Sequence, residues 1–389
     1  MDYDVVIVGG GVMGSSTAFH LLRADSSLSV AVVERDSGYE RASTVLSDGN
    51  VRIQFNLEEN ILMSQHALEV LATFDDDMAT ASFRPEVAAR RQGNLFLADE
   101  DWERAARAGL ALQRRLGCEV EWLSSEEIGY RFPAYRSDGI TGGTLGPADG
   151  AVDPAAVLRG YRSKAIELGA SFIEDEVSAL LADEAAMTGA RLIAGGDLRS
   201  DVVVNAAGAW GPDLARPLGV ILPVLPVMRT VYVVSSTIDT TGLPSVFLPS
   251  AVYALPERDA IWLIAWSRPE DPVGFDFTPA GQGRFTDLIW PELHRHLPAF
   301  EALRVERSWA GLYDVNTLDG NAIIGEWPTI AGLYLAAGFS GHGFQQAPAV
   351  GRYLSELILG REPVLDLARL GPERVVENRP LHEQGNRLI

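Results

Sequence analysis

The sequence predicts a mixed α/β protein in which a Rossmann-type dinucleotide-binding domain is combined with an antiparallel-sheet domain. The first observation is an aliphatic run over 5–8 that leads directly into a glycine motif over 9–14. The second is a change of character over 217–315, where alternating segments are rich in β-branched and aromatic residues. The third is another glycine-rich turn over 338–343, followed by an apolar helical pattern.

The first glycine motif has the spacing of a dinucleotide-binding turn. Its glycines are Gly9, Gly11 and Gly14. They suit a tight turn, a close approach to a pyrophosphate and a helix–strand contact, and the helix expected over 15–24 points its N–H groups at the phosphates. A strand is expected over 29–33, and Glu34 at its end is placed to accept hydrogen bonds from a ribose 2′-hydroxyl. The motif alone does not choose between FAD and NAD.

The loop over 42–50 consists mainly of small and polar residues. Such a loop suits a close approach of the backbone to a flavin or its diphosphate, although an ordinary polar loop has the same composition. Arg52 follows it, and a guanidinium can bind a carboxylate through two parallel hydrogen bonds. Arg52 is therefore a candidate carboxylate ligand, with a surface or structural arginine as the alternative.

The chain then alternates between helices and strands. Helices are expected over 58–82, 101–116, 124–128 and 154–168, and Asp153 is placed to cap the last of them. Strands are expected over 92–97, 171–174, 177–181, 190–194 and 201–205. The last strand runs into small residues over 206–211, which would let the backbone approach a cofactor at the carboxyl edge of the sheet. A turn that serves packing alone is the alternative.

The segment 217–315 predicts a separate antiparallel sheet for substrate binding. Its strands are expected over 227–234, 252–255, 260–266 and 305–313, with one helix over 279–297. Tyr253, Arg268 and Tyr313 lie in or beside these strands and are candidate substrate contacts, although aromatic residues on strands most often belong to a core. A strand over 333–336 and a helix that ends near 359 follow, and the polar tail after Pro363 is expected to pack outside.

Composition restricts the partners and the location. The formal net charge of −21 argues against nucleic acid or an anionic membrane as a partner. Cys118 is the only cysteine, so the chain offers no intrachain disulfide and no cysteine-based metal cluster, and no metal site is predicted. No apolar run approaches the roughly 20 residues of a membrane span. The first strand begins near residue 4, which leaves no room for a targeting segment, and a cytoplasmic location is expected.

Taken together, these stretches resemble the D-amino-acid-oxidase superfamily of FAD-dependent oxidoreductases, which includes sarcosine oxidase and glycine oxidase. The resemblance is carried by 9–14 with Glu34, by 149–154, by 205–210, by 319–321 with Gly325, and by 338–343. Three segments, 50–60, 309–317 and 338–350, look like the subgroup that contains the mitochondrial FAD-dependent oxidoreductase-domain protein of respiratory complex I assembly. The sarcosine and dimethylglycine dehydrogenases are more distant relatives.

The resemblance implies FAD as the cofactor and a Rossmann-type FAD-binding domain interleaved with the antiparallel substrate domain. The FAD-binding domain would comprise 1–80, 147–216 and 317–365, the substrate domain 81–146 and 217–316, and the C-terminal tail 366–389. The residues expected at the cofactor are Gly9, Gly11, Val12, Met13, Gly14, Glu34, Arg35, Ser43, Thr44, Ser47, Gly49, Asn50, Val177, Ala206, Ala207, Gly208, Trp210, Gly338, Phe339, Ser340, Gly341, His342, Gly343, Phe344 and Gln345.

Two departures from relatives matter. Some relatives attach the flavin covalently through a cysteine near the carboxyl terminus or through a histidine. This chain has no cysteine besides Cys118 and no histidine in the loop after Glu34, so non-covalent FAD is expected. The sarcosine oxidases use a lysine near the flavin to assist oxygen, whereas the only lysine here, Lys164, falls in an expected helix. Oxygen and another redox carrier are therefore both candidate electron acceptors.

The leading hypothesis is the oxidation of an amine or amino acid, with a secondary amine such as an N-substituted amino acid favoured. Hydride would pass from the carbon that bears nitrogen to flavin N5, and the resulting imine would hydrolyse. Arg52 is the first candidate for the substrate carboxylate and Arg268 the second. Tyr253 and Tyr313 would orient the substrate by hydrogen bonds, and His342 would tune the reduced flavin or contact the substrate.

Two other functions remain alternatives. One is the oxidation of a 2-hydroxy acid on the same scaffold, which activity on hydroxy acids but not on amines would identify. The other is a flavoprotein that acts mainly by binding or assembling a protein partner. That function would leave the flavin unbleached by any small amine and would return a stable partner in pull-down experiments.

Overall fold

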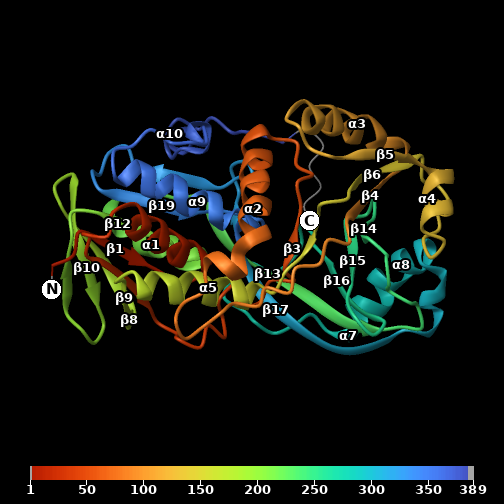
Figure 1. Ribbon diagram of the computed structural model, residues 1–389, viewed down its shortest axis with the longest axis horizontal. Helices are drawn as coiled ribbons and strands as arrows, with labels where there is room; N and C mark the ends of the chain where they lie inside the picture. Colours follow the sequence, from red (N-terminus) through yellow and green to blue (C-terminus); the bar gives the residue numbers. More distant parts are fainter. Residues whose placement is uncertain (1, 384–389) are drawn as a thin grey trace.

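The computed structural model describes residues 2–383 and contains two large sheets, one in each half of the molecule (Figure 1). The first is six-stranded, in the order β18-β19-β12-β1-β2-β8. Its strands are β1 (Val5–Val8), β2 (Val30–Glu34), β8 (Ser171–Glu174), β12 (Val203–Asn205), β18 (Ile323–Glu326) and β19 (Leu333–Ala337). All neighbours are parallel except β18, which is antiparallel to β19. The predicted mixed α/β class with a Rossmann-type sheet is confirmed.

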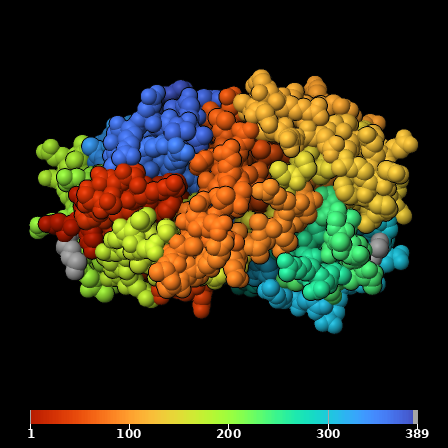
Figure 2. All heavy atoms as spheres, in the orientation of Figure 1, coloured from red at the N-terminus to blue at the C-terminus, as the bar shows by residue number. Residues whose placement is uncertain are grey.

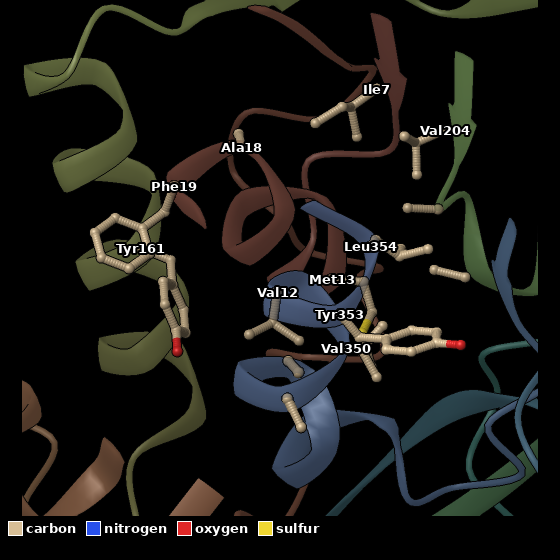
Figure 3. Packing of buried hydrophobic residues seen from close by; sticks show 14 of the residues in the cluster. Ile7, Val12, Met13, Ala18, Phe19, Tyr161, Val204, Val350, Tyr353 and Leu354 are labelled. Atoms are coloured by element: carbon tan, nitrogen blue, oxygen red, sulfur yellow. The ribbon is translucent and has the colours of Figure 1, made fainter. Parts of the chain in front are cut away.

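Helices cover one face of this sheet. They are α1 (Val12–Ala24), α2 (Glu58–Asp77), α5 (Pro154–Glu167) and α9 (Gly343–Ile358). Figure 3 shows Phe19 of α1 beside Tyr161 of α5, with a ring-centroid distance of 5.6 Å. Asp153 caps α5 as predicted, because its carboxylate accepts hydrogen bonds from the amides of Ala155 and Ala156. The apolar faces of these helices bury the side chains of β1 and β2 that point toward them.

A small antiparallel sheet covers the opposite face. Its strands are β9 (Val177–Asp183), β10 (Ala186–Leu192) and β11 (Asp197–Arg199). The strand expected over 190–194 was therefore wrong in its bounds, whereas the strand expected over 201–205 corresponds to β12 of the large sheet, which begins at Val203. The physical reason is a tight turn at Gly195 and Gly196, where the Leu192 amide donates to the Gly196 carbonyl and the chain reverses direction.

The second large sheet has eight strands in the order β17-β13-β16-β15-β14-β4-β6-β5. They are β4 (Asn94–Ala98), β5 (Glu121–Ser124), β6 (Gly142–Gly146), β13 (Val224–Ser235), β14 (Ser245–Phe247), β15 (Val252–Pro256), β16 (Ile261–Trp266) and β17 (Arg304–Asn316). Only β4 and β14 pair in parallel. The helices of this half are α3 (Glu100–Arg115), α4 (Ser125–Arg131), α7 (Gln282–Arg284), which continues through a π turn over 285–289, and α8 (Trp290–His296).

The two halves meet along α2 and the short antiparallel pair β3 (Asn50–Val51) and β7 (Gly150–Ala151). Figure 2 shows α2 and the chain after it, in orange, at the surface between the two halves. Shorter helical turns occupy Gly208–Trp210, Gly211–Ala215, Arg216–Leu218, Pro298–Ala302, Ala368–Leu370 and Glu373–Val376. No helix within residues 2–383 has the length and apolar character to cross a bilayer. The residue boundaries of the two predicted domains stay a prediction.

The tail does not pack outside as expected, because its apolar residues and one arginine are buried. Leu367 and Leu370 belong to the core beneath α1 and α9. The Arg374 guanidinium is buried and donates to the Asp319 carboxylate and to the Asn321 and Ala322 carbonyls. Farther along, the tail reaches the start of α2, where the Glu383 carboxylate accepts a hydrogen bond from the Asn60 side-chain amide. Residues 384–389 of the predicted tail lie outside the described residues.

Candidate functional site

A cavity of about 480 Å³ lies between the two large sheets. Of the residues expected at a cofactor or substrate, those that line it are Gly9, Gly11, Val12, Met13, Glu34, Arg35, Ser43, Thr44, Ser47, Asn50, Arg52, Val177, Ala206, Ala207, Gly208, Trp210, Tyr253, Tyr313, Phe339, Gly341, His342, Gly343, Phe344 and Gln345. Those that lie outside the lining are Gly14, Gly49, Arg268, Gly338 and Ser340. Segments far apart in the chain therefore meet at one site.

One end of the cavity is formed by the turn between β1 and α1. Gly14 lies behind this turn, where a Cβ atom would come within 2.0 Å of the Gly9 carbonyl oxygen, so it serves the helix–strand contact and does not face the cavity. The Glu34 carboxylate accepts a hydrogen bond from the Gly10 amide at 2.8 Å. Burial raises the pKa of Glu34, while that bond and one from the Asp36 amide oppose the rise.

Next to Glu34, the wall of this end is made of stacked side chains. The Arg35 guanidinium lies 4.0 Å from the centre of the Trp210 ring, and both residues line the cavity. Tyr39 and Arg41 also line it and were not anticipated, because nothing in the composition of a loop tells which of its side chains turn inward. This end is thus lined by backbone and flat side chains, with the Glu34 carboxylate beside the glycine turn.

The loop over 42–50 spans the space between the two halves and is held from both sides. The Thr44 hydroxyl accepts a hydrogen bond from the Val12 amide at 3.2 Å, at the start of α1. On the other side, the Ser43 hydroxyl donates to the Leu312 carbonyl of β17 at 2.7 Å, and the Trp309 indole donates to the Leu46 carbonyl at 2.9 Å. The loop is therefore positioned by both sheets.

Small residues and backbone N–H groups at the first end fit the adenosine diphosphate half of FAD. The glycine turn leaves the N terminus of α1 facing the cavity, and the loop over 42–50 leaves room beside it. The turn over 338–342 precedes α9, so a second helix N terminus meets the cavity at its other end. A flavin ring placed there would meet backbone N–H groups, which stabilise negative charge.

Arg52 and His342 meet at this other end. Arg52 Nη2 donates a hydrogen bond to His342 Nε2 at 3.1 Å, and the backbone amide of Arg52 donates one to Gln345 Oε1 at 2.6 Å. Burial and the neighbouring guanidinium lower the pKa of His342 to about 3. The imidazole is therefore neutral at physiological pH and accepts at Nε2. The ring also packs edge-on against Phe55, with the ring centroids 5.1 Å apart.

Arg52 is a buried cation that has no carboxylate partner among residues 2–383. Its residue exposure is 6%, and its Nε atom has no hydrogen-bond partner within the described chain. The guanidinium lies 4.7 Å from the Phe55 ring centroid. Burial lowers the pKa of Arg52, and the field of Glu383 is the largest opposing influence, yet neither Glu383 nor any other described carboxylate comes within ion-pair distance. An anionic ligand would complete this arrangement.

Two tyrosines stand beside Arg52. The Tyr253 hydroxyl donates to the Asp48 carboxylate at 2.6 Å, and burial raises its pKa well above the usual value. Burial also raises the pKa of Tyr313 to about 12. A Cβ atom on Gly341 would come within 2.2 Å of the Tyr313 ring, so only glycine lets this ring pack against the turn before α9. Both phenols stay protonated and act as hydrogen-bonding groups.

Arg268, the second predicted carboxylate ligand, is not part of this group. Its guanidinium lies over the Trp266 ring and pairs with Glu270 at 3.1 Å near the surface. Arg229 takes the inward position, because it projects from β13 into the cavity and pairs with the buried Asp271. Asp271 also pairs with Arg284, so the three side chains form one buried cluster. The alternation along β13 places Arg229 on an inner face, but the sequence holds no sign of its acidic partner.

Buried acids support the backbone around Arg52 and His342. The Asp149 carboxylate accepts hydrogen bonds from the Ile53 amide at 2.8 Å and from the Gln54 side chain at 2.9 Å, and burial raises its pKa to about 7. The Asp314 carboxylate accepts from the Gly338 amide at 2.8 Å, and burial raises its pKa to about 6. Gly338 thus orients the turn without facing the cavity.

Comparisons with known proteins agree with this arrangement. The family described as FAD dependent oxidoreductase matches residues 4–357. FAD-dependent oxidoreductase domain-containing protein 1 of Bos taurus is 35% identical over 401 residues, which cover 92% of this chain and 81% of the relative. Glycine oxidase of Pseudomonas putida is 28% identical, over 96% of this chain and 99% of the relative. L-proline dehydrogenase of P. horikoshii has the same fold, with a TM-score of 0.87 at 24% identity over 98% of this chain and 99% of that structure. This chain belongs to the family of FAD-dependent oxidoreductases.

Proposed function

We propose that the chain oxidises an amino acid at the carbon that bears nitrogen, with a secondary amine such as an N-substituted amino acid as the favoured substrate. The observation that carries the proposal is Arg52, a buried guanidinium in the cavity with no carboxylate partner among the described residues. Leaving such a charge unpaired is costly, and a substrate carboxylate would offset that cost through charge-assisted hydrogen bonds.

The residues of this end would bind and orient the substrate, while bound FAD supplies the capacity to accept a hydride. Arg52 would hold the substrate carboxylate. Tyr313, beside the turn before α9, would restrict the orientations in which the substrate can bind. His342, neutral at physiological pH, keeps Arg52 oriented by accepting a hydrogen bond from its guanidinium. Phe247 and Trp266 line the cavity with apolar surface and would help to keep water from the reacting carbon.

The resemblance to glycine and sarcosine oxidases supports an amine in place of a hydroxyl group at the reacting carbon. Arg52 by itself would bind a 2-hydroxy acid as well, because its guanidinium would contact only the carboxylate and not the amine or hydroxyl group on the neighbouring carbon. The preference for a secondary amine rests on the resemblance to the sarcosine oxidases.

The test is bleaching of the flavin absorbance under anaerobic conditions by a panel of N-methyl amino acids, D- and L-amino acids, opines and 2-hydroxy acids. We expect bleaching by amino acids, with N-substituted ones fastest. Bleaching by hydroxy acids alone would identify the first alternative. A flavin that light reduces normally, but that no amine bleaches, would contradict the proposal and favour the partner-binding function.

The electron acceptor is tested with the substrate found in this way. Lys164 donates to the Ala79 carbonyl at 2.8 Å and pairs with Glu167 on α5, outside the cavity lining. The described residues that line the cavity therefore include no lysine that could assist the reaction with oxygen. We expect an artificial dye to reoxidise the enzyme faster than oxygen does, as measured by dye reduction and oxygen consumption on the same sample.

A further inference from the structure

Asp48 is a carboxylate in the cavity wall. Neither cofactor binding by the glycine motif nor carboxylate binding by Arg52 gives it a role. It lies near the end of the loop over 42–50 and lines the cavity. One carboxylate oxygen accepts a hydrogen bond from the Asn50 amide at 3.1 Å, and the other accepts the Tyr253 hydroxyl at 2.6 Å. Each oxygen has a second lone pair, so Asp48 can still accept hydrogen bonds from a ligand in the cavity.

Tyr253 and Tyr313 line the same cavity as Asp48 and Arg52. The Tyr253 hydroxyl donates directly to the Asp48 carboxylate. Burial is the main cause that raises the pKa of both phenols, the field of Asp48 raises it further, and that of Arg52 lowers it. The cavity thus holds a positive group at Arg52 and a negative group at Asp48.

We propose that Asp48 binds the ammonium group of a zwitterionic amino acid whose carboxylate is held by Arg52. An ammonium donates up to three hydrogen bonds, and a secondary ammonium donates two, so a carboxylate with free lone pairs is its natural acceptor. Tyr253 positions the Asp48 carboxylate through the 2.6 Å hydrogen bond. The pair would let the site distinguish an amino acid from a ligand that has a carboxylate but no nitrogen. The inference rests on the proposed function and adds the residue that selects the amine.

Matched ligands test this. Methoxyacetate has the shape of sarcosine with an ether oxygen in place of the ammonium, and tetrahydrofuran-2-carboxylate is related to proline in the same way. The holoenzyme and its Asp48→Asn variant are titrated with both pairs, and dissociation constants are taken from flavin absorbance changes or, for ligands that reduce the flavin, from the concentration dependence of the anaerobic reduction rate. Asp48→Asn should weaken amino-acid binding about 10- to 100-fold and leave the ether acids within about 2-fold.

Two controls separate a binding role from a structural one. Asp239 makes the same kind of turn, accepting the Thr241 amide, but lies exposed and outside the cavity, so Asp239→Asn should change neither ligand series. Tyr253→Phe removes only the hydroxyl that orients Asp48, and it should weaken amino-acid binding by a smaller factor. Flavin content and spectrum are measured for every variant, so a loss of cofactor is recognised.

The possible outcomes are distinct. Equal weakening of amino acids and ether acids in Asp48→Asn would mean that Asp48 only shapes the site, and unchanged amino-acid binding would mean that it does not touch the ligand; either result overturns the inference and leaves the proposed function standing. If the unmodified holoenzyme binds hydroxy acids but no amino acid, the proposed function fails and the inference fails with it.

Discussion

The two ends of the cavity are built in different ways. The end at the turn between β1 and α1 is made of backbone groups and small residues, together with Glu34, Arg35 and Trp210, and part of it lies within the first stretch of chain. The end at Arg52 and His342 is made of charged and aromatic side chains from β13, β15 and β17, from Arg52 just after β3 and from His342 just before α9. The first end depends on close approach, and the second on charges that segments distant in sequence bring together.

The difference predicts different responses to substitution. At the first end any added volume displaces the backbone, because the helix and the strand touch directly at Gly14. At the second end the backbone is supported separately, by Asp149 below Ile53 and by Asp314 below Gly338. A side chain at the second end can therefore change ligand binding without changing the fold, and the following predictions compare the two ends in order of expected effect.

The largest effect is expected at the first end for Gly14→Val. Its Cβ atom would lie 2.0 Å from the Gly9 carbonyl oxygen and 3.0 Å from the Ile7 side chain, so α1 must move away from β1. We expect a loss of at least about 3 kcal/mol in the free energy of unfolding, and loss of FAD from the purified protein. Urea denaturation and the flavin-to-protein absorbance ratio measure this. Gly281→Ala, at a position with no atom within 4 Å of the added Cβ, is the control and should retain FAD.

The next effect is expected at the second end for Arg52→Ala. Removing the guanidinium should weaken binding of carboxylated ligands about 100-fold while FAD content stays near that of the unmodified protein. Arg52→Lys keeps a charge but not the fork of donors, and should weaken binding about 10-fold. Arg268→Ala, whose side chain lies outside the cavity lining, is the matched control and should bind normally. Normal binding by Arg52→Ala would exclude it as the carboxylate ligand.

The third prediction concerns stability and pH at the second end. The pKa of His342 is about 3 in the folded protein and near 6.5 in the unfolded chain, so below pH 6.5 the unfolded chain takes up a proton that the folded protein does not. The free energy of unfolding should therefore fall as the pH decreases, by about 2 kcal/mol between pH 7.5 and pH 5.0 from this group. In His342→Gln the free energy of unfolding should decrease less between these two pH values, because the contribution of His342 is missing. Urea denaturation of both proteins at pH 7.5 and pH 5.0 measures this. An equal decrease in both proteins would show that His342 is protonated in the folded state.

The smallest effect is expected at the first end for Glu34→Gln. The substitution replaces a carboxylate oxygen that accepts the Gly10 amide by a group of nearly the same size, so the fold should persist. We expect FAD affinity to fall about 10-fold, because one charge-assisted acceptor at the proposed ribose position is lost. Titration of apoprotein with FAD, followed by flavin fluorescence, measures this. Glu40→Gln, at an exposed position in the chain that follows β2, is the control and should bind FAD as the unmodified protein does. Unchanged FAD affinity in Glu34→Gln would rule out the proposed role of Glu34.

Much of the fold was predictable because its signals are local. The strand, turn and helix around Gly14 and the cap at Asp153 each follow from residues a few positions apart, whose conformations depend on near neighbours. The bounds of β10 were missed because the turn at Gly195 and Gly196 competes with a strand over 190–194. The buried tail was missed because its apolar residues are few and because the acceptors of Arg374 come from Asp319 and its neighbours, in a segment distant in sequence.

The sequence by itself determined the Rossmann-type unit, the place of the glycine turn and Glu34, and the candidacy of Arg52 and His342, since each depends on residue type and local spacing. Only the tertiary structure decided that Arg52 donates to His342, that Arg268 faces away while Arg229 faces the cavity, and that Asp48, held by Tyr253, lines the same cavity as Arg52. The physical reason is that a guanidinium, a carboxylate and a phenol act through distance and burial. Those quantities arise only when strands from both sheets come together around the cavity.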